Sequence, residues 1–465
     1  MWGRILGRGG SGGGEPVLRG IPRAGHGAPG VHSYGEAVSG ERTTVGVPRE
    51  AAPGEQRVAL VPAALDTLSR AGADVIIEAG AGVSAGFSDD AYRQKGAKVA
   101  GRREVLGADV ILHVRGFSAG RATLDLLRPG QVVIGFLDPL SDSKTARELA
   151  EREVTALAID LMPRITRAQA MDALSSQATV GGYKAVLLAA RALPRMFPML
   201  TTAAGTIPPA RAFIIGAGVA GLQAIATAKR LGAVVEAYDV RAAAREQVES
   251  VGARFVELPI EAGESEDKGG YAKAQGEEFY RRQRELMHTV VSGSDVVITT
   301  AAIPGKPAPV LVTKEMVAAM TRGSVIVDLA AERGGNCEVS QADQVITTEN
   351  GVMVLAPTNL PATVPYHASS MYARNISTFL NHLMTDGKVR IDTEDEITRE
   401  TLICRGGVVT NPRVRAALGL EEEEEPVDVR EAKASGAPLA QPPTGNGQGR
   451  LEPSQLEGGK GGGAS

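Results

Sequence analysis

The sequence is poor in cysteine, in aromatic residues and in net charge, and each shortage excludes a class of protein. Cys337 and Cys404 are the only cysteines, too few for a disulfide framework or a cysteine-based metal site, which fits a reducing compartment. Aromatic residues make up 4% of the chain and the formal net charge is −4, so nucleic acid meets neither a stacking platform nor an electrostatic attraction. No apolar run approaches the roughly 18 residues that a membrane-spanning helix needs. We therefore expect no nucleic-acid partner, no metal and no direct membrane span.

The two ends of the chain lack the pattern of folded sequence. Residues 1–43 are rich in glycine, show almost no periodicity and contain more arginines than acidic residues. An arginine-rich, acid-poor leader is typical of a transit peptide, although glycine at this density does not form an amphipathic helix. The favoured alternative is an upstream extension, with the folded chain starting near Val45. Residues 421–465, rich in glutamate, proline and glycine, predict a disordered tail.

One segment in the middle of the chain carries the clearest signal. An apolar run at 213–215 is followed by three glycines at GxGxxG spacing, a helical pattern over 222–231 and a second apolar run that ends at Asp239. The glycines are Gly216, Gly218 and Gly221. In a dinucleotide-binding fold the first glycine makes a tight turn, the second lets the backbone approach a pyrophosphate, and the third lets the helix pack on the strand. The open helix N-terminus then offers N–H groups to the phosphates. This order of elements predicts a dinucleotide site rather than a tight turn without a ligand.

Asp239 also bears on which dinucleotide is bound. It lies 23 residues after Gly216, where a carboxylate can accept hydrogen bonds from both hydroxyls of the adenosine ribose. Its charge would repel a 2′-phosphate, which favours NAD over NADP. Arg241 argues the other way, because an arginine near this position can accommodate that phosphate. We predict NAD as the nucleotide bound by this chain.

Short β-rich runs alternate with helical patterns along the body of the chain, which indicates parallel α/β sheets. In a first unit, from about 44 to 163, such runs lie at 44–50, 57–62, 74–78, 108–114 and 131–136. In a second unit, from about 180 to 362, strands are expected at 212–215, 233–238, 253–257, 295–300, 324–329 and 352–355. Six strands with interleaved helices suit a doubly wound sheet with its ligand at the carboxyl ends of the strands. Two loops at such ends, 299–307 and 328–335, could face the nucleotide or could be plain turns.

Two apolar helical segments, 175–193 and 365–384, are expected to link the units, and the chain would then return to the first unit. The predicted fold class is α/β, with two Rossmann-like parallel-sheet domains, the nucleotide-binding one inserted in the other, linked by long helices. The predicted boundaries are 44–163 and 385–420 for the discontinuous N-terminal domain, and 164–384 for the nucleotide-binding domain with its bridging helices.

Two segments are far more specific than the glycine motif. They are Arg-Ile-Thr-Arg-Ala-Gln-Ala-Met-Asp-Ala-Leu-Ser-Ser-Gln at 164–177 and Gly-Gly-Tyr-Ala-Lys at 269–273. Further matching stretches lie at 46–50, 216–223, 238–241, 303–309 and 327–338. Together they resemble the soluble NAD(H)-binding component, domain I, of the proton-translocating NAD(P) transhydrogenase, and the resemblance covers about residues 44–420.

The resemblance implies a Re/Si-specific reaction in which hydride passes directly between NAD(H) on this chain and NADP(H) on a partner component, coupled to proton translocation. Direct transfer needs two nicotinamide rings held close, aligned and away from water, and no side-chain acid or base. The family's functional residues fall here on Arg164, Gln169, Asp172, Ser175 and Tyr271. Gln169 would face the partner, Tyr271 would lie in a loop that closes over the nucleotide, and the other three would fix the nicotinamide carboxamide and its ribose.

The family's nucleotide contacts also match by position. Beside the three glycines they fall on Arg164, Ile165, Thr166, Gln169, Val219, Asp239, Val240, Arg241, Gly270, Gln283 and Ala302. Thr166 stands where serine is usual, which keeps the hydroxyl. Ala302 stands where many relatives have leucine, so only a backbone or looser contact is implied.

The resemblance further implies membrane-spanning and NADP-binding partner components and a homodimer. The implied location is the cytoplasm, against the inner membrane through those partners. If residues 1–43 are a transit peptide, the location would be the mitochondrial matrix or another organelle. Alternatively, the chain is the truncated part of a longer polypeptide that continues into membrane helices.

Plainer structural interpretations exist for the same residues. From the sequence alone, each polar residue of 164–175 could cap a helix, and Asp172 and Ser175 stand just before a long helical pattern. The histidines at 113, 288, 367 and 382 are scattered without ligand spacing, and we expect them to be structural.

Alanine dehydrogenase is the alternative function, because it shares the fold and the opening Gly-Val-Pro-[Arg/Lys]-Glu. Amino-acid oxidation needs a base and a clamp for the substrate carboxylate. The lysine of that family is replaced by Arg115, its histidine is missing from 135–139, and its aspartate is matched at best by Glu332. A third possibility, a non-catalytic NAD sensor, would not need the 164–175 segment to orient a nicotinamide.

Overall fold

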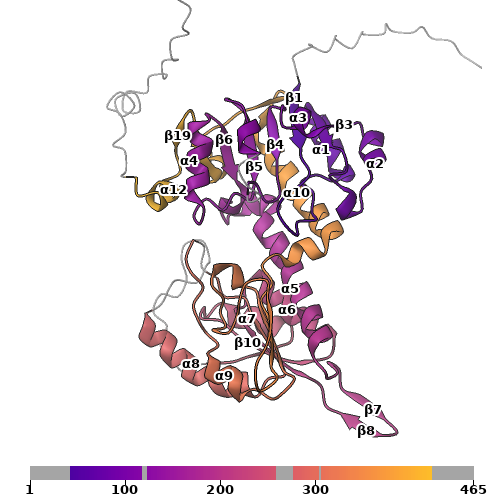
Figure 1. Ribbon diagram of the computed structural model, residues 1–465, viewed down its shortest axis with the longest axis vertical. Coiled ribbons are helices and arrows are strands. Elements are labelled where there is room, and N and C mark those ends of the chain that lie inside the picture. Colours follow the sequence, from indigo (N-terminus) through magenta and orange to yellow (C-terminus); the bar gives the residue numbers. More distant parts are fainter. Residues whose placement is uncertain (1–41, 118–122, 258–275, 303–304, 421–465) are drawn as a thin grey trace, which may run out of the picture. The chain divides into compact units, whose positions relative to one another are not determined.

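The computed structural model describes residues 42–117, 123–257, 276–302 and 305–420. Both ends of the chain and the predicted site residues Gly270 and Tyr271 lie outside this part. Within it the chain builds two α/β units, each with a mostly parallel sheet as its central layer and helices packed against it (Figure 1). This arrangement confirms the predicted fold class.

The first unit contains an eight-stranded sheet in the order β19-β18-β6-β5-β4-β1-β2-β3. Its strands are β1 (Thr43–Val47), β2 (Ala73–Glu78), β3 (Lys98–Ala100), β4 (Val110–Leu112), β5 (Val132–Gly135), β6 (Thr155–Ala158), β18 (Leu402–Arg405) and β19 (Val408–Val409). The first six pair in parallel, and β18 and β19 extend the sheet antiparallel beyond β6. Its helices are η1 (Pro62–Ala64), α1 (Leu65–Arg70), η2 (Val83–Ala85), α2 (Asp89–Gln94), α3 (Arg102–Val105), η3 (Leu124–Leu126), α4 (Ser143–Glu151), η4 (Ile159–Leu161), α11 (Glu396–Thr401) and α12 (Pro412–Ala417). The chain therefore leaves this sheet after β6 and returns to complete it.

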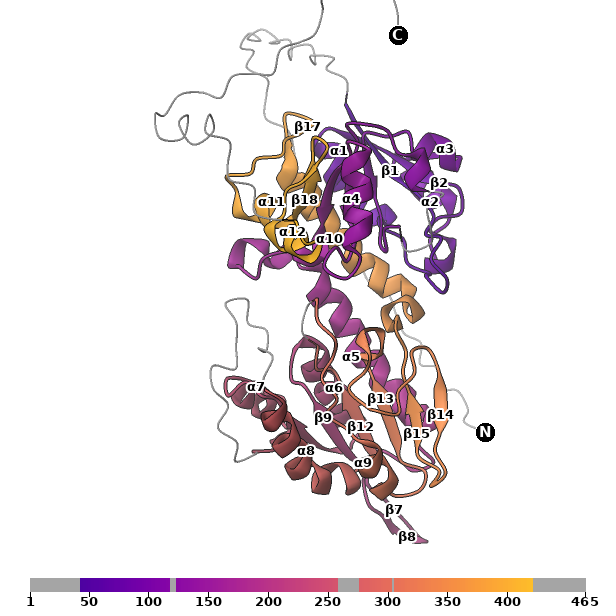
Figure 2. The ribbon, with the colours of Figure 1, turned by 60° about the vertical axis from the view of Figure 1, so that its left-hand side comes forward.

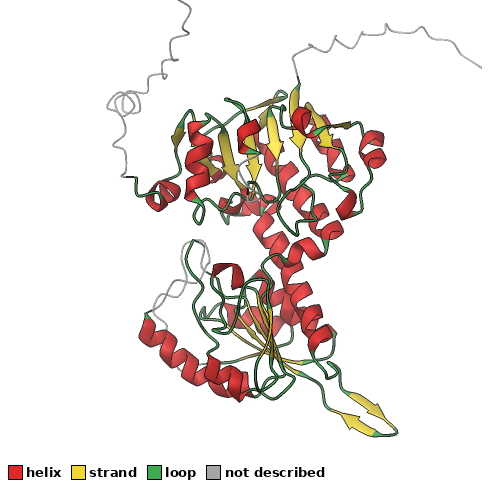
Figure 3. Ribbon diagram, viewed as in Figure 1, coloured by secondary structure: helices red, strands yellow, loops and turns green. Residues whose placement is uncertain are grey.

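The second unit contains a seven-stranded sheet in the order β11-β10-β9-β12-β13-β15-β14. Its strands are β9 (Arg211–Ile215), β10 (Val234–Tyr238), β11 (Arg254–Phe255), β12 (Val296–Thr299), β13 (Val325–Asp328), β14 (Val345–Thr347) and β15 (Met353–Leu355). Its helices are α6 (Val219–Arg230), α7 (Ala244–Ser250), α8 (Glu277–Ser292), α9 (Lys314–Ala319), η6 (Ala331–Arg333) and η7 (Leu360–Thr363). Without the antiparallel edge strand β14, the order is that of a doubly wound dinucleotide-binding sheet. Figure 3 shows helices on both sides of this sheet, and β12 and β13 are accordingly buried at every residue.

Two long helices connect the units. The short η5 (Thr166–Met171) leads into the first of them, α5 (Ala173–Ala192), and the second is α10 (Pro365–Leu383). A small hairpin follows each long helix along the chain: β7 (Leu200–Thr202) with β8 (Gly205–Ile207) after α5, and β16 (Met384–Thr385) with β17 (Lys388–Val389) after α10. Helix α5, which Figure 2 shows beside α6, contributes to both hydrophobic cores. Its first residue, Ala173, is buried in the core of the first unit, whereas Ala185, Val186 and Ala189 are buried in that of the second. Helix α10 packs into the first core through Tyr372 and its apolar neighbours.

One predicted strand is wrong, and several strands were not predicted. Residues 57–62 resemble a strand because four consecutive residues are apolar, and these are buried, but they pair with no strand. The amide of Val58 instead donates to the hydroxyl of Ser369 on α10. The missed strands are two to four residues long, too short to show a period; they are β3, β6, β7, β8, β14, β16, β17, β18 and β19.

Helices α5 and α6 approach each other very closely at one glycine. A Cβ atom placed on Gly182 of α5 would lie 2.0 Å from the backbone oxygen of Ala220, in the first turn of α6. The neighbouring Gly181 has no such contact, because a Cβ there would meet nothing within 4 Å. Only a residue without a side chain fits at 182, which fixes the distance between the two helices.

Gly182→Ala should force the α5 and α6 backbones apart and lower the free energy of unfolding by about 2 kcal/mol, as overpacking does. Gly181→Ala is the matched control: it adds the same methyl group to open space and gains helix propensity, so stability should rise by up to about 1 kcal/mol. Urea unfolding followed by circular dichroism measures both. Equal stabilities of the two variants would contradict the close approach.

Candidate functional site

The glycine turn between β9 and α6 has the geometry that the motif predicts. Gly216 has a φ of +96°, and a Cβ there would lie 2.6 Å from the hydroxyl of Thr300. A Cβ on Gly221 would lie 1.8 Å from the carbonyl oxygen of Gly216, so the helix packs directly on the turn. Gly218 is the N-cap residue of α6, no side chain caps this end, and a Cβ on it would meet nothing within 4 Å. The turn therefore presents an uncapped helix N-terminus to open space, as a phosphate-binding turn requires.

Asp239 follows β10 and is tied to the glycine turn. Its Oδ2 accepts a hydrogen bond of 2.7 Å from the amide of Ala217, and its Oδ1 accepts one of 2.9 Å from the amide of Arg241. The guanidinium of Arg241 adds Nε to Oδ1 and Nη2 to Oδ2, each at 2.9 Å. From the sequence we expected Asp239 to repel a 2′-phosphate and Arg241 to act separately by attracting it. In the structure the two form one ion pair, so repulsion of a 2′-phosphate by Asp239 is weaker than a free charge would produce.

The 164–175 segment forms the turn of η5 and the start of α5. Arg164, Thr166 and Gln169 are exposed, and Ile165 is half-buried. Asp172 caps α5, because its Oδ1 accepts the amide of Ser175 at 2.9 Å and its Oδ2 accepts the Ser175 hydroxyl at 2.5 Å. The plainer interpretation of these two residues as a helix cap therefore describes a contact that exists.

The η5 turn is also tied to the chain that follows α10. Arg167 Nη2 donates to Asp395 Oδ1 at 2.9 Å, and His382 Nε2 lies 2.9 Å from Asp395 Oδ2. Burial would raise the pKa of Asp395, but the hydrogen bonds from the Thr398 amide, His382 and Arg167 outweigh it and hold the pKa below its usual range. Asp395 is thus a stable anion that anchors the turn, and His382 has the structural contact expected of it.

Gln283 of α8 brings an unpaired acceptor to the end of β10. The side chain is buried and donates from Nε2 to the Tyr238 hydroxyl at 3.0 Å. Its Oε1 accepts no hydrogen bond from any described part of the chain. Burial raises the pKa of Tyr238 to about 12, although the bond from Gln283 opposes this, so the hydroxyl stays protonated. A buried acceptor without a donor is costly, so this oxygen is a candidate partner for a hydrogen-bond donor that the described residues do not supply.

The loops after β12 and β13 are fixed by two residues that sequence reasoning missed. Asp328 is fully buried and accepts hydrogen bonds from the hydroxyls of Thr299 and Ser340 and from two backbone amides. Asn336 is also fully buried: its Oδ1 accepts from the amide of Ala301, and its Nδ2 donates to the carbonyl of Ala301. The predicted contact residue Ala302 is exposed beside that anchor, and Val240 is half-buried beside Asp239. The sequence did contain a signal for Asp328, because this acid directly ends the apolar run of β13, as Asp239 ends the run of β10.

A second polar group lies at the carboxyl ends of the strands of the first sheet. His113 is buried next to Glu50, with its Nδ1 3.5 Å from Glu50 Oε1. Arg115, two residues on, donates to Glu332 of η6 at 2.5 Å. Glu332 and Arg115, which the sequence led us to expect in place of the acid and the lysine of alanine dehydrogenase, pair with each other. Arg333 in turn binds Asp138 at 2.9 Å, so two ion pairs of opposite direction link η6 to the first unit.

Among the described residues, no helix combines the length and apolar character needed to cross a membrane, and no cluster of three potential ligands could hold a metal.

Comparison with known proteins identifies the family. A family model described as alanine dehydrogenase/PNT, N-terminal domain, matches residues 46–181, and the corresponding C-terminal domain model matches residues 185–412. The first part of NAD(P) transhydrogenase subunit alpha of Rhodospirillum rubrum is 46% identical over 376 residues, which cover 79% of this chain and 98% of the relative. The chain belongs to the family of NAD(P) transhydrogenase alpha subunits. This confirms the resemblance drawn from the sequence.

Other relatives show where the chain stands in this family. The crystal structure of a transhydrogenase from Sinorhizobium meliloti matches with 44% identity and a TM-score of 0.70, over 79% of this chain and 99% of that one. Alanine dehydrogenase of Bacillus subtilis is 28% identical over 386 residues, which cover 81% of this chain and 95% of the relative. The chain is therefore more similar to these transhydrogenases than to the dehydrogenase.

Asp160, in η4 directly after β6, is a further acid at the carboxyl ends of the strands of the first sheet, and its titration can be tested. Burial, with a smaller contribution from the charge of Asp138, raises the pKa of Asp160 to about 6. The folded state therefore binds this proton more tightly than the unfolded state. Its contribution to stability is present at low pH and is lost as pH rises from about 4 to about 6.

Asp160→Asn keeps an acceptor for the amide of Leu137, which donates to Asp160 at 3.1 Å, and removes the buried charge. Above pH 6 the variant should be more stable than the wild type by about 2 kcal/mol, and at pH 4 the two should be nearly equal. Urea unfolding across pH 4–8 measures the difference. A difference that does not change with pH would contradict the raised pKa.

Proposed function

We propose that this chain is the NAD(H)-binding component of a proton-translocating transhydrogenase and that it passes hydride directly between its own nucleotide and NADP(H) on a partner component. The observation that carries the proposal is the continuity of α5. This helix starts at the 164–175 segment and packs at Gly182 on the first turn of α6, next to the glycine turn. The likeness to transhydrogenase subunits over most of the chain supports the same conclusion.

The residues divide the binding of one dinucleotide between them. The uncapped start of α6 would bind the pyrophosphate through backbone N–H groups. Asp239 would hold the adenosine ribose, and Gln283 Oε1 would accept a hydrogen bond at the same end. Arg164, Asp172 and Ser175 would hold the nicotinamide carboxamide and its ribose.

Hydride transfer itself is a matter of alignment. NADH bound here supplies the hydride, and the chain contributes orientation and exclusion of water. Gln169 is exposed on η5, where its amide can reach a partner component. No described residue has to gain or lose a proton in this step.

The partners follow from the same proposal. A membrane-spanning component would couple transfer to proton movement, and the chain would lie against the inner membrane through it. We also propose a homodimer, because the β7–β8 hairpin, which Figure 1 shows extending away from the seven-stranded sheet, has exposed apolar side chains at Leu200 and Ile207 and, directly before β7, at Met199. Sedimentation of the isolated chain at twice its mass would support the dimer, and sedimentation as a monomer at micromolar concentration would contradict it.

The decisive test combines two assays and one variant. With NADP-binding and membrane components from a transhydrogenase, the chain should reduce NADP with NADH in a single turnover, and with NAD and L-alanine it should form no pyruvate. Gln169→Asn keeps the amide but shortens the side chain by one methylene. It should leave NADH affinity within a few fold and slow transfer by about 10-fold or more, because misplacement by about 1 Å can cost about 100-fold.

Gln247→Asn is the matched control, since Gln247 is an exposed glutamine on α7 outside the site. It should leave both quantities unchanged. Steady pyruvate formation would establish the alanine dehydrogenase alternative instead. Transfer at the wild-type rate by Gln169→Asn would show that η5 does not align the ring.

Nucleotide selectivity tests the adenosine end. We expect calorimetry to show tighter binding of NADH than of NADPH. Asp239→Asn should weaken the binding of NADH by about 10-fold, because a hydrogen bond to a charged group contributes about 1.5–3 kcal/mol. Arg241→Gln leaves the Asp239 charge unneutralised and should widen the preference for NADH. If Arg241→Gln instead prefers NADH over NADPH less strongly than the wild type does, Arg241 does not offset the charge of Asp239.

A further inference from the structure

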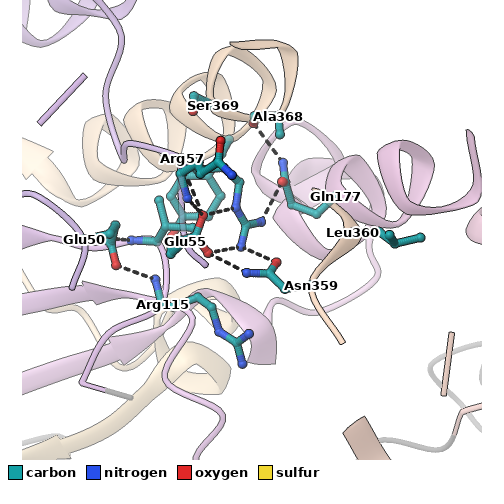
Figure 4. A network of polar contacts seen from close by, with 12 residues as sticks. Glu50, Glu55, Arg57, Arg115, Gln177, Asn359, Leu360, Ala368 and Ser369 are labelled. Carbon is teal, nitrogen blue, oxygen red and sulfur yellow. Dashed lines mark hydrogen bonds and ion pairs between the residues drawn. The ribbon is translucent and has the colours of Figure 1, made fainter. Parts of the chain in front are cut away.

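A buried ion pair lies near the start of α5 and is drawn in Figure 4. Arg57 Nη2 binds Glu55 Oε2 at 2.6 Å, and Arg57 Nε binds Glu55 Oε1 at 2.8 Å. The two side chains are 4% and 0% exposed. Hydrogen bonds from Arg57 and Asn359 outweigh burial and keep the pKa of Glu55 below its ordinary value, so the carboxyl is ionised at neutral pH. A buried pair of this kind stays in place only if its remaining donors and acceptors are satisfied.

Two side-chain amides complete the network. Asn359 accepts from Arg57 Nη2 at 3.1 Å and donates to Glu55 Oε2 at 3.0 Å. Gln177, in the second turn of α5, accepts from Arg57 Nη1 at 2.8 Å through Oε1. This contact fixes which way the Gln177 amide points, so Nε2 donates to the carbonyl of Ala368 on α10 at 3.0 Å.

Helix α10 also makes a hydrogen bond to η5, on the other side of the corner at which η5 passes into α5. Asn375 Nδ2 donates to the carbonyl of Ala170 in η5 at 2.9 Å. Residues 368 and 375 are seven positions apart, which is about two turns, so both contacts lie on one face of α10. Between the two anchored points lie Asp172 and Ser175, in the short corner where η5 becomes α5.

We infer that Gln177 is a positioning residue: through Arg57 on one side and Ala368 on the other, it sets the place of the 164–175 segment. This rests on the proposed function, in which that segment aligns the nicotinamide. Gln177 is buried beneath the corner, so it acts on alignment and not through contact with the nucleotide. Its loss would free one side of the corner while Asn375 still holds the other, and the segment would tilt.

The test variant is Gln177→Met, which keeps the volume of the side chain and leaves the Glu55–Arg57 pair and Asn359 in place. Single-turnover transfer should fall by about 10-fold or more, because small misplacements are costly for aligned reactants, while NADH affinity stays within a few fold. Asn359→Leu is the matched control. It removes two hydrogen bonds from the same ion pair, and so also costs stability, but it leaves the contacts of Gln177 intact.

Asn359→Leu should transfer within a few fold of wild type, measured well below the unfolding temperature of either variant. If hydride transfer is slowed equally in both variants, Gln177 only stabilises the fold and the inference is overturned. Transfer at the wild-type rate by Gln177→Met would also overturn it. If the wild type itself transfers no hydride, the proposed function fails, and amide hydrogen exchange then decides the inference. Faster exchange at 166–175 in Gln177→Met but not in Asn359→Leu would support positioning, and unchanged exchange would overturn it.

Discussion

The close approach of α5 to α6 is the constraint on which the candidate site depends. At Gly182 the backbone of one helix lies against the backbone of the other, with no room for a side chain between them. Since α5 is buried at one end in the first core and at the other in the second, this contact ties both cores to the first turn of α6. About ten residues of helix, or about 15 Å, separate that contact from the cap of α5. A rigid helix thus spaces the two ends of the predicted dinucleotide site.

Two buried charged groups in this framework have a complete set of partners. The Glu55–Arg57 pair is enclosed by Gln177 and Asn359. Asp328 accepts four hydrogen bonds, one from Thr299 at the end of β12 and three from the loop that follows β13. Removing one member of such a set leaves an unpaired buried charge, which costs more than the pair itself contributes. These networks therefore define the position of a loop more than they add to stability.

Much of the nucleotide-binding unit could be predicted from the sequence because its signals are local. The glycine spacing, the acid at the end of β10 and the continuous apolar runs of β12 and β13 each lie within a few residues. What failed depends on distant partners. Residues 57–62 are apolar like a strand, yet the amide of Val58 binds Ser369, more than three hundred residues away. The return of the chain to the first unit was expected from the sequence, but no local pattern shows that it joins the first sheet as β18 and β19. The same limit applies to the site, because Gln177 belongs to a recognised segment and only the fold shows that it joins Arg57 to α10.

Two aspartates of the site differ in how much capacity they keep for a ligand. An ionised carboxylate offers about four acceptor positions. Asp172 uses two of them on Ser175, so capping α5 and binding a nucleotide are compatible. Asp239 uses four, on Ala217 and Arg241, so a ribose hydroxyl must displace the Arg241 guanidinium to bind it directly. At the proposed adenosine end a side chain therefore has to move, whereas at the proposed nicotinamide end Asp172 keeps acceptor positions for a ligand while it caps α5.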